Sequence, residues 1–244
     1  MIEPNTIVLA DCLEHSSNIP SESVDLIISD PPWGCNAYDK GDYNDDEEFI
    51  KEKIPLWLAE FERILKPTCH VYIYVPTKYI ENWLIPFRQI FKFNNILTAI
   101  NMKRGKSRPN QFRNNSQMIL YGSKGRARDF NKSDFILTSD VWFKDKRNKN
   151  PQKYIYDYPC YLPSYIKATV EESVGHPDEK NAILIKHLIE ISSNPGDMVV
   201  DFFMGSGPVK IAAIETGRQF FGYENNPEYF KMSTERDCDV KQNT

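Results

Sequence analysis

The sequence predicts an α/β protein with a mostly parallel β-sheet, and three observations lead to this prediction. Short apolar runs typical of buried strands alternate with amphipathic stretches typical of helices along most of the chain. Two of the apolar runs end in compact motifs, Asp30-Pro31-Pro32-Trp33 and Asp201 to Gly207. Only 20 of the 244 residues follow Glu224, which closes the strand after the second motif. Because 20 residues are too few to complete a sheet, the remaining strands must come from the N-terminal half.

The N-terminal half predicts five strands and two helices. The strands are expected at Thr6–Ala10, Val24–Ser29, His70–Val75, Ile96–Met102 and Gln117–Tyr121. The first helix starts in the acidic run 44–48, because acidic side chains are favourable at a helix N-terminus, and it ends at Lys66-Pro67. The second helix spans Tyr79–Phe91 and is expected to be interrupted at Pro86.

Regular patterning is lost from about Gly122 to Gly175, where Pro, Asn, Tyr and basic residues dominate. This composition predicts an irregular insertion and no second full domain, so residues 1–244 are expected to form a single domain. Order returns with helices at Asp178–Ser193, Pro208–Thr216 and Pro227–Asp237, and with strands at Met198–Val200 and Gln219–Tyr223.

The bulk composition excludes several classes of protein. A hydrophobic fraction of 41% with 26% charged residues is ordinary for a soluble globular protein. Apolar runs stay shorter than a membrane-spanning helix needs and the N-terminus lacks a basic-then-apolar leader, so a cytoplasmic protein without membrane contact is predicted. The five cysteines include no C-x-x-C pair, which argues against a disulfide framework or a zinc site, and no metal is expected.

Charge is distributed unevenly, although the net charge is only −4. Residues 103–153 carry 14 basic and 4 acidic side chains, whereas residues 1–102 carry 8 and 16, and residues 154–244 carry 8 and 14. Such a basic block is either a solvated face or a nucleic-acid-binding surface, and the Asn, Gln and Trp residues within it suit phosphate contacts combined with base readout. We therefore predict a target-recognition region at about residues 103–174. Its nucleic-acid-binding candidates are Arg104, Arg108, Arg113, Arg126, Arg128 and Arg147.

The motif from Asp201 to Gly207 has the properties of a loop that binds a nucleotide-like cofactor. Gly205 and Gly207 allow a tight turn into a helix whose N-terminal amides face the ligand. Glu224 follows Gly205 by 19 residues, a spacing that places a carboxylate on ribose hydroxyls. A dinucleotide dehydrogenase is disfavoured because Lys210 replaces the third glycine of G-x-G-x-x-G, and the P-loop motif is absent.

The motif Asp30-Pro31-Pro32-Trp33 combines a carboxylate, a rigid turn and an aromatic plate at the end of a strand. One interpretation is a strand end with a partly buried tryptophan. The other is a site for an amino group on a planar ring, in which Asp30 and the Pro31 carbonyl accept the amino hydrogens and Trp33 stacks on the ring. The strand that precedes Asp201 is expected beside the strand that precedes Asp30, so both motifs flank one crevice at a topological switch point.

These motifs resemble those of the S-adenosylmethionine-dependent amino-methyltransferases of DNA, in the beta-class arrangement where the catalytic motif precedes the cofactor motif. The resemblance rests on D-P-P-[YW] at Asp30, on D-x-F-x-G-S-G at Asp201 and on G-x-E-x-x-x-x-Y at Gly222. Ala10-Asp11-Cys12-Leu13 is similar to the family's G-D-x-L. His176 to Asn181 is similar to H-P-T-Q-K-P but departs from it at three of six positions.

The resemblance implies a circularly permuted class-I methyltransferase fold, which is Rossmann-like, and S-adenosyl-L-methionine as the cofactor. It implies catalytic roles for Asp30, Pro31, Pro32 and Trp33. It implies cofactor contacts for Asp11, Cys12, Asp30, His176, Lys180, Asp201, Phe202, Phe203, Gly205, Ser206, Gly207, Glu224 and Asn225.

The activity implied is direct transfer of a methyl group to N6 of an adenine flipped out of double-stranded DNA. Cytosine-N4 members more often carry Ser where Asp30 stands, so adenine is favoured. An RNA adenine-N6 methyltransferase and a catalytically silent cofactor- or DNA-binding subunit remain as alternatives. A small recognition region suggests a short target or a homodimer, and a cognate restriction endonuclease is compatible with the resemblance. The acidic stretch Tyr38–Glu48 is either a loop that orders over the base or a helix entry.

Overall fold

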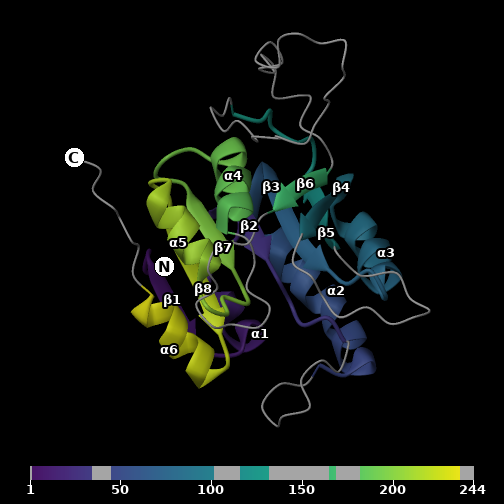
Figure 1. Ribbon diagram of the computed structural model, residues 1–244, viewed down its shortest axis with the longest axis horizontal. Helices are drawn as coiled ribbons and strands as arrows, with labels where there is room; N and C mark the ends of the chain where they lie inside the picture. Colours follow the sequence, from purple (N-terminus) through teal and green to yellow (C-terminus); the bar gives the residue numbers. More distant parts are fainter. Residues whose placement is uncertain (1, 35–44, 102–115, 132–164, 169–181, 237–244) are drawn as a thin grey trace.

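The computed structural model describes residues 2–34, 45–101, 116–131, 165–168 and 182–236, and its centre is an eight-stranded sheet (Figure 1). In spatial order the strands are β1 (Thr6–Leu9), β8 (Gln219–Glu224), β7 (Met198–Asp201), β2 (Val24–Ser29), β3 (Leu65–Val75), β5 (Ser116–Ser123), β4 (Lys92–Asn101) and β6 (Tyr165–Ala168). Strand β5 is antiparallel to both neighbours, and every other pair is parallel. The predicted mostly parallel sheet is therefore confirmed.

Helices cover both faces of this sheet. Helices α2 (Glu47–Ile64) and α3 (Ile80–Ile90) pack on one face, and α4 (Ala182–Ser192) and α5 (Pro208–Glu215) pack on the other (Figure 1). Two shorter elements, α1 (Cys12–His15) and the 3-10 helix η1 (Ser16–Asn18), follow β1, and α6 (Pro227–Glu235) packs near β1 and β8. Successive residues of β2 enter opposite cores, as the two-residue period of a strand requires: Ile27 joins the α2 side, and Leu26 and Ile28 join the α4 side.

The predicted meeting of the two motif strands is confirmed. β7 lies directly beside β2, with Leu26 opposite Val199 and Ile27 opposite Val200. β8 and then β1 follow on the far side of β7, so the first strand of the chain pairs with the last (Figure 1). The carboxyl ends of these four parallel strands lie at one edge of the sheet, which we call the carboxyl edge; the opposite edge is the amino edge.

Some local predictions were wrong. Pro86 does not interrupt its helix, because α3 continues through it and buries Trp83 and Phe87 on one face; this packing compensates for the missing backbone hydrogen bond. The first helix ends close to the predicted point, at Ile64, but β3 starts earlier than predicted, at Leu65, so Lys66-Pro67 lies within the strand, where the register against β2 shifts. Strand β6 lies within the stretch that was predicted to be irregular.

Within the described ranges, every helix is too short or too polar to cross a membrane.

Candidate active site

The two sequence motifs meet at the carboxyl edge through a serine hydroxyl. Ser29 Oγ donates a hydrogen bond to Asp201 Oδ1 at 2.8 Å and accepts one from the Phe202 amide at 3.2 Å. The Phe203 amide also donates to Asp201 Oδ1, at 2.9 Å. Ser29 and Asp201 are 1% and 2% exposed, so these bonds form away from water. Ser29 was not among the predicted site residues, because a serine at the end of a strand carries no sequence signal of such a role.

The glycine loop has the tight backbone that the sequence predicts. Gly205 and Gly207 adopt φ values of 54° and 82°, which favour glycine. A Cβ atom on Gly207 would lie 3.2 Å from Cβ of Ser233, so α6 also restricts this position. The loop leads directly into α5, which has Pro208 in its first turn.

Glu224 connects the end of β8 to this loop. Its Oε2 atom accepts a hydrogen bond from the Gly205 amide at 2.7 Å, and its Oε1 atom accepts one from the Asn226 amide at 2.8 Å. The side chain is 2% exposed, and burial raises the pKa of the carboxyl, while the backbone amides oppose that shift. The spacing of 19 residues between Gly205 and Glu224 therefore corresponds to a direct contact.

Helix α6 stabilises the loop from the other side. Lys210 Nζ donates to the carbonyl oxygens of Ser233 at 2.8 Å and Arg236 at 2.9 Å, at the C-terminal end of α6. Arg236 donates in turn to the Ser206 carbonyl at 3.1 Å. Lys210, which replaces the third glycine of a dinucleotide motif, thus fixes α6 against the loop.

Several carboxylates converge where the two motifs meet. Burial raises the pKa of Asp201 to about 7; the negative charges of Asp30 and Glu224 add to the shift, and the hydrogen bonds from Phe203 and Ser29 oppose it. Asp201 and Glu224 receive hydrogen bonds from neutral amides and a hydroxyl. Such a site favours a ligand that carries positive charge.

A pocket opens beside these groups. It is lined by Ala10, Asp11, Cys12, Leu13, Pro32, Phe49, Lys53, Trp57, Phe202, Phe203, Glu224 and Asn225. Asp11 accepts a hydrogen bond from the Leu13 amide at 2.8 Å and so caps α1 at the pocket wall. Burial, followed by the charge of Asp11, raises the pKa of the Cys12 thiol to about 12, so Cys12 lines the pocket as a neutral group.

The Asp30-Pro31-Pro32-Trp33 motif adjoins the pocket through Pro32. Trp33 Nε1 donates to Asp30 Oδ1 at 3.1 Å, so the aromatic ring and the carboxylate of the motif are in direct contact. The Gly34 amide donates to Asp45 Oδ1 at 2.6 Å, and Gly34 has a φ of 70°. A Cβ atom at Gly34 would lie 3.1 Å from Cα of Glu47, so the end of the motif packs closely on the start of α2.

Comparison with known proteins identifies this arrangement. A family model described as DNA methylase, N6_N4_Mtase, matches residues 24–235 of the 244. The chain belongs to this DNA methylase family. As a member of this family it uses S-adenosylmethionine, and its fold is that of solved DNA methyltransferases.

Individual relatives cover nearly the whole methylase. The DNA adenine methyltransferase YhdJ of Escherichia coli K12 is 31% identical over 96% of this chain and 83% of the relative. The type II methyltransferase M.HpaI of Haemophilus parainfluenzae is 28% identical over 94% of this chain and 73% of the relative. Among solved structures, the M1.HpyAVI–SAM complex has a TM-score of 0.67 at 21% identity, and the match covers 95% of this chain and 99% of that one. This last similarity supports the fold.

Of the predicted cofactor residues that the structure describes, six line the methylase pocket: Asp11, Cys12, Phe202, Phe203, Glu224 and Asn225. Pro32, which was predicted to be catalytic, also lines it. Asp201, Gly205, Ser206 and Gly207 lie beside it in the loop, and Asp30 ends the neighbouring strand. His176 and Lys180 lie outside the described residues.

The wall contributed by α2 was not predicted. Phe49, Lys53 and Trp57 recur every four residues and face the pocket. The Trp57 ring meets the Phe203 ring edge-on at a centroid distance of 5.0 Å, and Lys53 Nζ lies 5.3 Å from the Phe49 ring centroid. The same spacing is typical of a helix face that packs on a core, so the sequence alone gave no way to distinguish the two.

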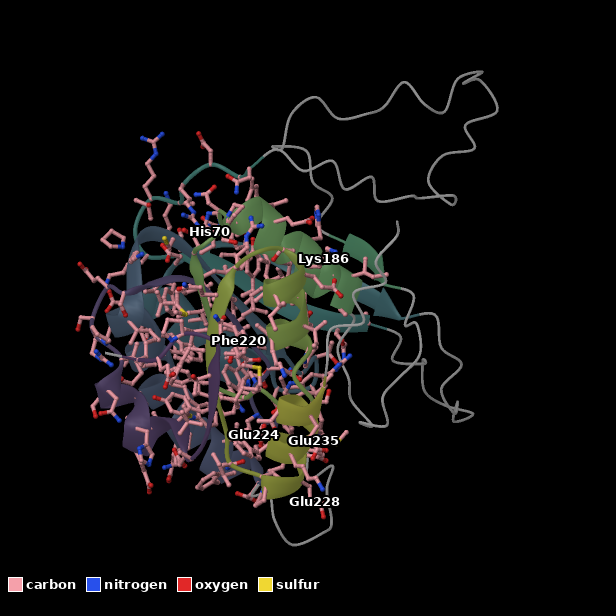
Figure 2. The ribbon with its side chains drawn as sticks, turned by 90° about the vertical axis from the view of Figure 1, so that its left-hand side faces the viewer. His70, Lys186, Phe220, Glu224, Glu228 and Glu235 are labelled. Atoms are coloured by element: carbon pink, nitrogen blue, oxygen red, sulfur yellow. The ribbon has the colours of Figure 1, made fainter. Side chains whose placement is uncertain are left out.

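Arg126 and Arg128, two of the predicted DNA-binding arginines, lie at the edge of the sheet opposite the pocket. Because β5 is antiparallel, the loop that carries Arg126 and Arg128 leaves the sheet at the amino edge. There the guanidinium of Arg128 donates to the Ser192 carbonyl and lies 3.7 Å from Asp197. Figure 2 shows His70, which contacts the Arg128 carbonyl, at the end of the molecule opposite Glu224. Arg104, Arg108, Arg113 and Arg147 lie outside the described residues.

The described part of the methylase contains no group of three or more His, Cys, Asp or Glu side chains arranged to hold a metal ion.

Proposed function

We propose that this methylase transfers a methyl group from S-adenosylmethionine to the exocyclic N6 of an adenine that has been flipped out of duplex DNA. The observation that carries the proposal is the contact between the two motifs. Asp30 follows Ser29 directly, and Ser29 hydrogen-bonds to Asp201 at the start of the cofactor loop. A base held at Asp30 is therefore adjacent to a cofactor held by the loop.

Asp30 and the Pro31 carbonyl would accept hydrogen bonds from the two N–H groups of the adenine amino group, which loses one proton as the N–CH3 bond forms and the S–CH3 bond of the sulfonium breaks. In adenine the nitrogen lone pair is delocalised into the ring, which makes the amino group a poor nucleophile. Hydrogen bonds that favour a tetrahedral nitrogen localise this pair and act mainly in the transition state. No covalent enzyme intermediate is needed.

Trp33 would stack on the flipped base. Its indole N–H is directed to Asp30, which holds the ring beside the carboxylate. Stacking of a base on an aromatic side chain is worth about 1–3 kcal/mol and offsets part of the cost of extruding the base from the duplex.

The cofactor residues are proposed in the same way. Bound S-adenosylmethionine supplies a methyl group activated by a sulfonium. Glu224 would bind the ribose hydroxyls, Asp11 and the backbone of α1 would bind the adenine, and the amides of the glycine loop would face the methionine part. His176 and Lys180 are proposed to act near the methionine end. The buried carboxylate of Asp201 would stabilise the positive charge of the ligand.

Adenine is the proposed target base because the motif carries Asp30, and a relative that is 31% identical is named as a DNA adenine methyltransferase. The family name includes N4 as well as N6 methylases, so cytosine N4 is the second candidate.

We propose residues 103–174, apart from the amino-edge loop that carries Arg126 and Arg128, as the target-recognition region within a single methylase domain. Strand β4 ends at Asn101 and β5 begins at Ser116, and both of these ends lie at the carboxyl edge. This supports roles for Arg104, Arg108 and Arg113 near the DNA; Arg147 is included on its charge alone. A homodimer and a cognate restriction endonuclease are proposed partners, in keeping with the type II methyltransferases among the relatives.

The test is incubation of the purified protein with radiolabelled S-adenosylmethionine and, in parallel, unmethylated genomic DNA or structured RNA. Label is expected in DNA, and hydrolysis to nucleosides should recover it as N6-methyladenine. Recovery as N4-methylcytosine would establish the second candidate, and label confined to RNA would overturn the DNA assignment. Sequencing of the modified DNA would then give the recognition sequence.

A further inference from the structure

The hydroxyl of Ser29 connects the two halves of the active site. Ser29 is the last residue of β2 and immediately precedes Asp30. Its Oγ atom donates to the Asp201 side chain at 2.8 Å and accepts from the Phe202 backbone at 3.2 Å. One hydroxyl thus contacts both the side chain and the main chain at the start of the cofactor loop.

These contacts lie beyond the regular pairing of the two strands. The register between β2 and β7 comprises Leu26 with Val199 and Ile27 with Val200. Continued by two residues, this register would place Ser29 opposite Phe202, whose amide the hydroxyl receives. Along the paired residues, β2 and β7 are connected by backbone hydrogen bonds. Where the two strands end and their motifs begin, the Ser29 side chain supplies the connection instead.

The environment makes this connection costly to lose. Ser29, Asp201 and Phe202 are each at most 2% exposed. Removal of the hydroxyl would leave the Phe202 amide without this acceptor and would leave Oδ1 of Asp201 with the Phe203 amide as its remaining hydrogen-bond donor. A buried polar group without its hydrogen-bond partner destabilises its surroundings. Here the affected surroundings are the junction between the Asp30 motif, which is proposed to hold the base, and the loop that is proposed to hold the cofactor.

We infer that Ser29 is a positioning residue for methyl transfer, whose hydroxyl holds the Asp30 turn in register with the cofactor loop. The inference rests on the proposed function, because it concerns the alignment of the base nitrogen with the methyl group. Direct transfer needs both reactants in one line at near-contact distance, and a misplacement of about 1 Å can cost about 100-fold in rate. Ser29 itself would touch neither the base nor the cofactor.

The test compares Ser29→Ala, Ser29→Cys and Ser29→Thr with the wild-type protein in single-turnover methylation of DNA at saturating cofactor. Ser29→Ala should lower the rate by about 10- to 100-fold with a change in cofactor affinity of less than about threefold. Ser29→Cys keeps a side chain of similar size but a weak donor, and should also be slow. Ser29→Thr keeps the hydroxyl and should recover most of the rate.

A matched control is Ser23→Ala, which removes a hydroxyl just before the other end of the same strand. Ser23 Oγ donates to the Pro20 carbonyl at 2.7 Å, outside the site, and its loss should leave the single-turnover rate unchanged.

Two results would overturn the inference. One is a wild-type rate in Ser29→Ala, or in Ser29→Cys if the alanine variant does not fold. The other is a loss confined to cofactor affinity, which would make the serine a support for the loop alone. If instead the wild-type protein transferred no methyl group to DNA, the proposed function would fail before Ser29 was tested.

Discussion

The acidic side chains at the two edges of the sheet have different kinds of partner. At the amino edge, acidic side chains meet basic ones: Asp25 lies 2.7 Å from Lys66, and Asp197 lies 3.7 Å from Arg128. At the carboxyl edge, Asp201 and Glu224 are buried with backbone amides and a hydroxyl as their partners. The amino edge is therefore internally neutralised, whereas the carboxyl edge holds negative charge that a cationic cofactor can balance.

The histidine at the amino edge supports this contrast. His70 is fully buried, and its ring contacts Ser192 Oγ at 3.0 Å and the Arg128 carbonyl at 3.1 Å. Burial lowers the pKa of His70 to about 4, so the ring is neutral near pH 7. A titratable residue is thus used for packing at one edge, while carboxylates face a pocket at the other.

The largest effect is expected from Asp30→Ala at the carboxyl edge. Loss of the carboxylate removes a hydrogen-bond acceptor from the reacting amino group, so the rate of methyl transfer should fall by about 10²- to 10³-fold or more. Cofactor binding, measured by calorimetry, should remain. Undiminished transfer would mean that Asp30 takes no part in the chemistry, whereas the absence of transfer by the wild-type protein would favour a silent cofactor-binding subunit.

Glu224→Gln should have the next largest effect. The glutamine NH2 group would face either the Gly205 amide or the Asn226 amide, and both of these are hydrogen-bond donors. The neutral side chain would also form a weaker hydrogen bond to the ribose hydroxyls than the carboxylate does. Cofactor affinity should fall by about 10- to 100-fold, since hydrogen bonds to charged groups contribute about 1.5–3 kcal/mol.

The control for this variant is Glu228→Gln, which changes an exposed carboxylate on the neighbouring helix α6 (Figure 2). Equal calorimetric affinities for the two variants would remove Glu224 from the cofactor site.

A smaller effect is expected on the pH dependence of cofactor binding, which tests the negative charge of Asp201 at the carboxyl edge. Asp201 has its pKa raised to about 7, so it is mainly neutral at pH 6 and mainly ionised at pH 8. A cationic ligand favours the ionised form, and affinity should therefore rise as pH increases through 7, by up to about tenfold. In Asp201→Asn this rise should disappear in calorimetric titrations; its persistence would assign the dependence to another group.

The same shift predicts how the stability of the ligand-free protein changes. When the pKa of a carboxyl is higher in the folded than in the unfolded state, then at a pH between the two pKa values the group is protonated in the folded state and ionised in the unfolded state. The contribution of Asp201 to the free energy of unfolding should therefore decline as pH rises from about 4 to about 7, and it should be constant above that range. Thermal unfolding of wild type and Asp201→Asn across this range would test the sign.

Arg128→Ala should have the smallest effect on activity. Its guanidinium contacts the Ser192 carbonyl and Asp197 at the amino edge, so its loss should lower the melting temperature by a few degrees. The affinity for DNA, measured by fluorescence anisotropy, should not change. A weaker affinity for DNA would restore Arg128 to the recognition surface and would contradict the separation of the two edges.

The local sequence predicted the strands and the glycine turn that form the candidate site. Val24–Ser29 and the strand before Asp201 are short apolar runs, and Gly205 and Gly207 need backbone angles that few other residues adopt. These features depend on residues that are close together in the chain. The order of the motifs can also be read directly from the sequence. The prediction that the two strands belong to one sheet is confirmed by the pairing of β2 with β7.

Other features depended on contacts between distant segments. The role of Ser29 arises from a partner 172 residues away, and the α2 wall has the same four-residue spacing as an ordinary core face. The placement of Arg126 and Arg128 follows from the reversed direction of β5, which residue patterns do not encode. Strand periodicity specifies which side chains are buried but not the direction in which a strand runs or the neighbour it pairs with; those are decided when the sheet assembles.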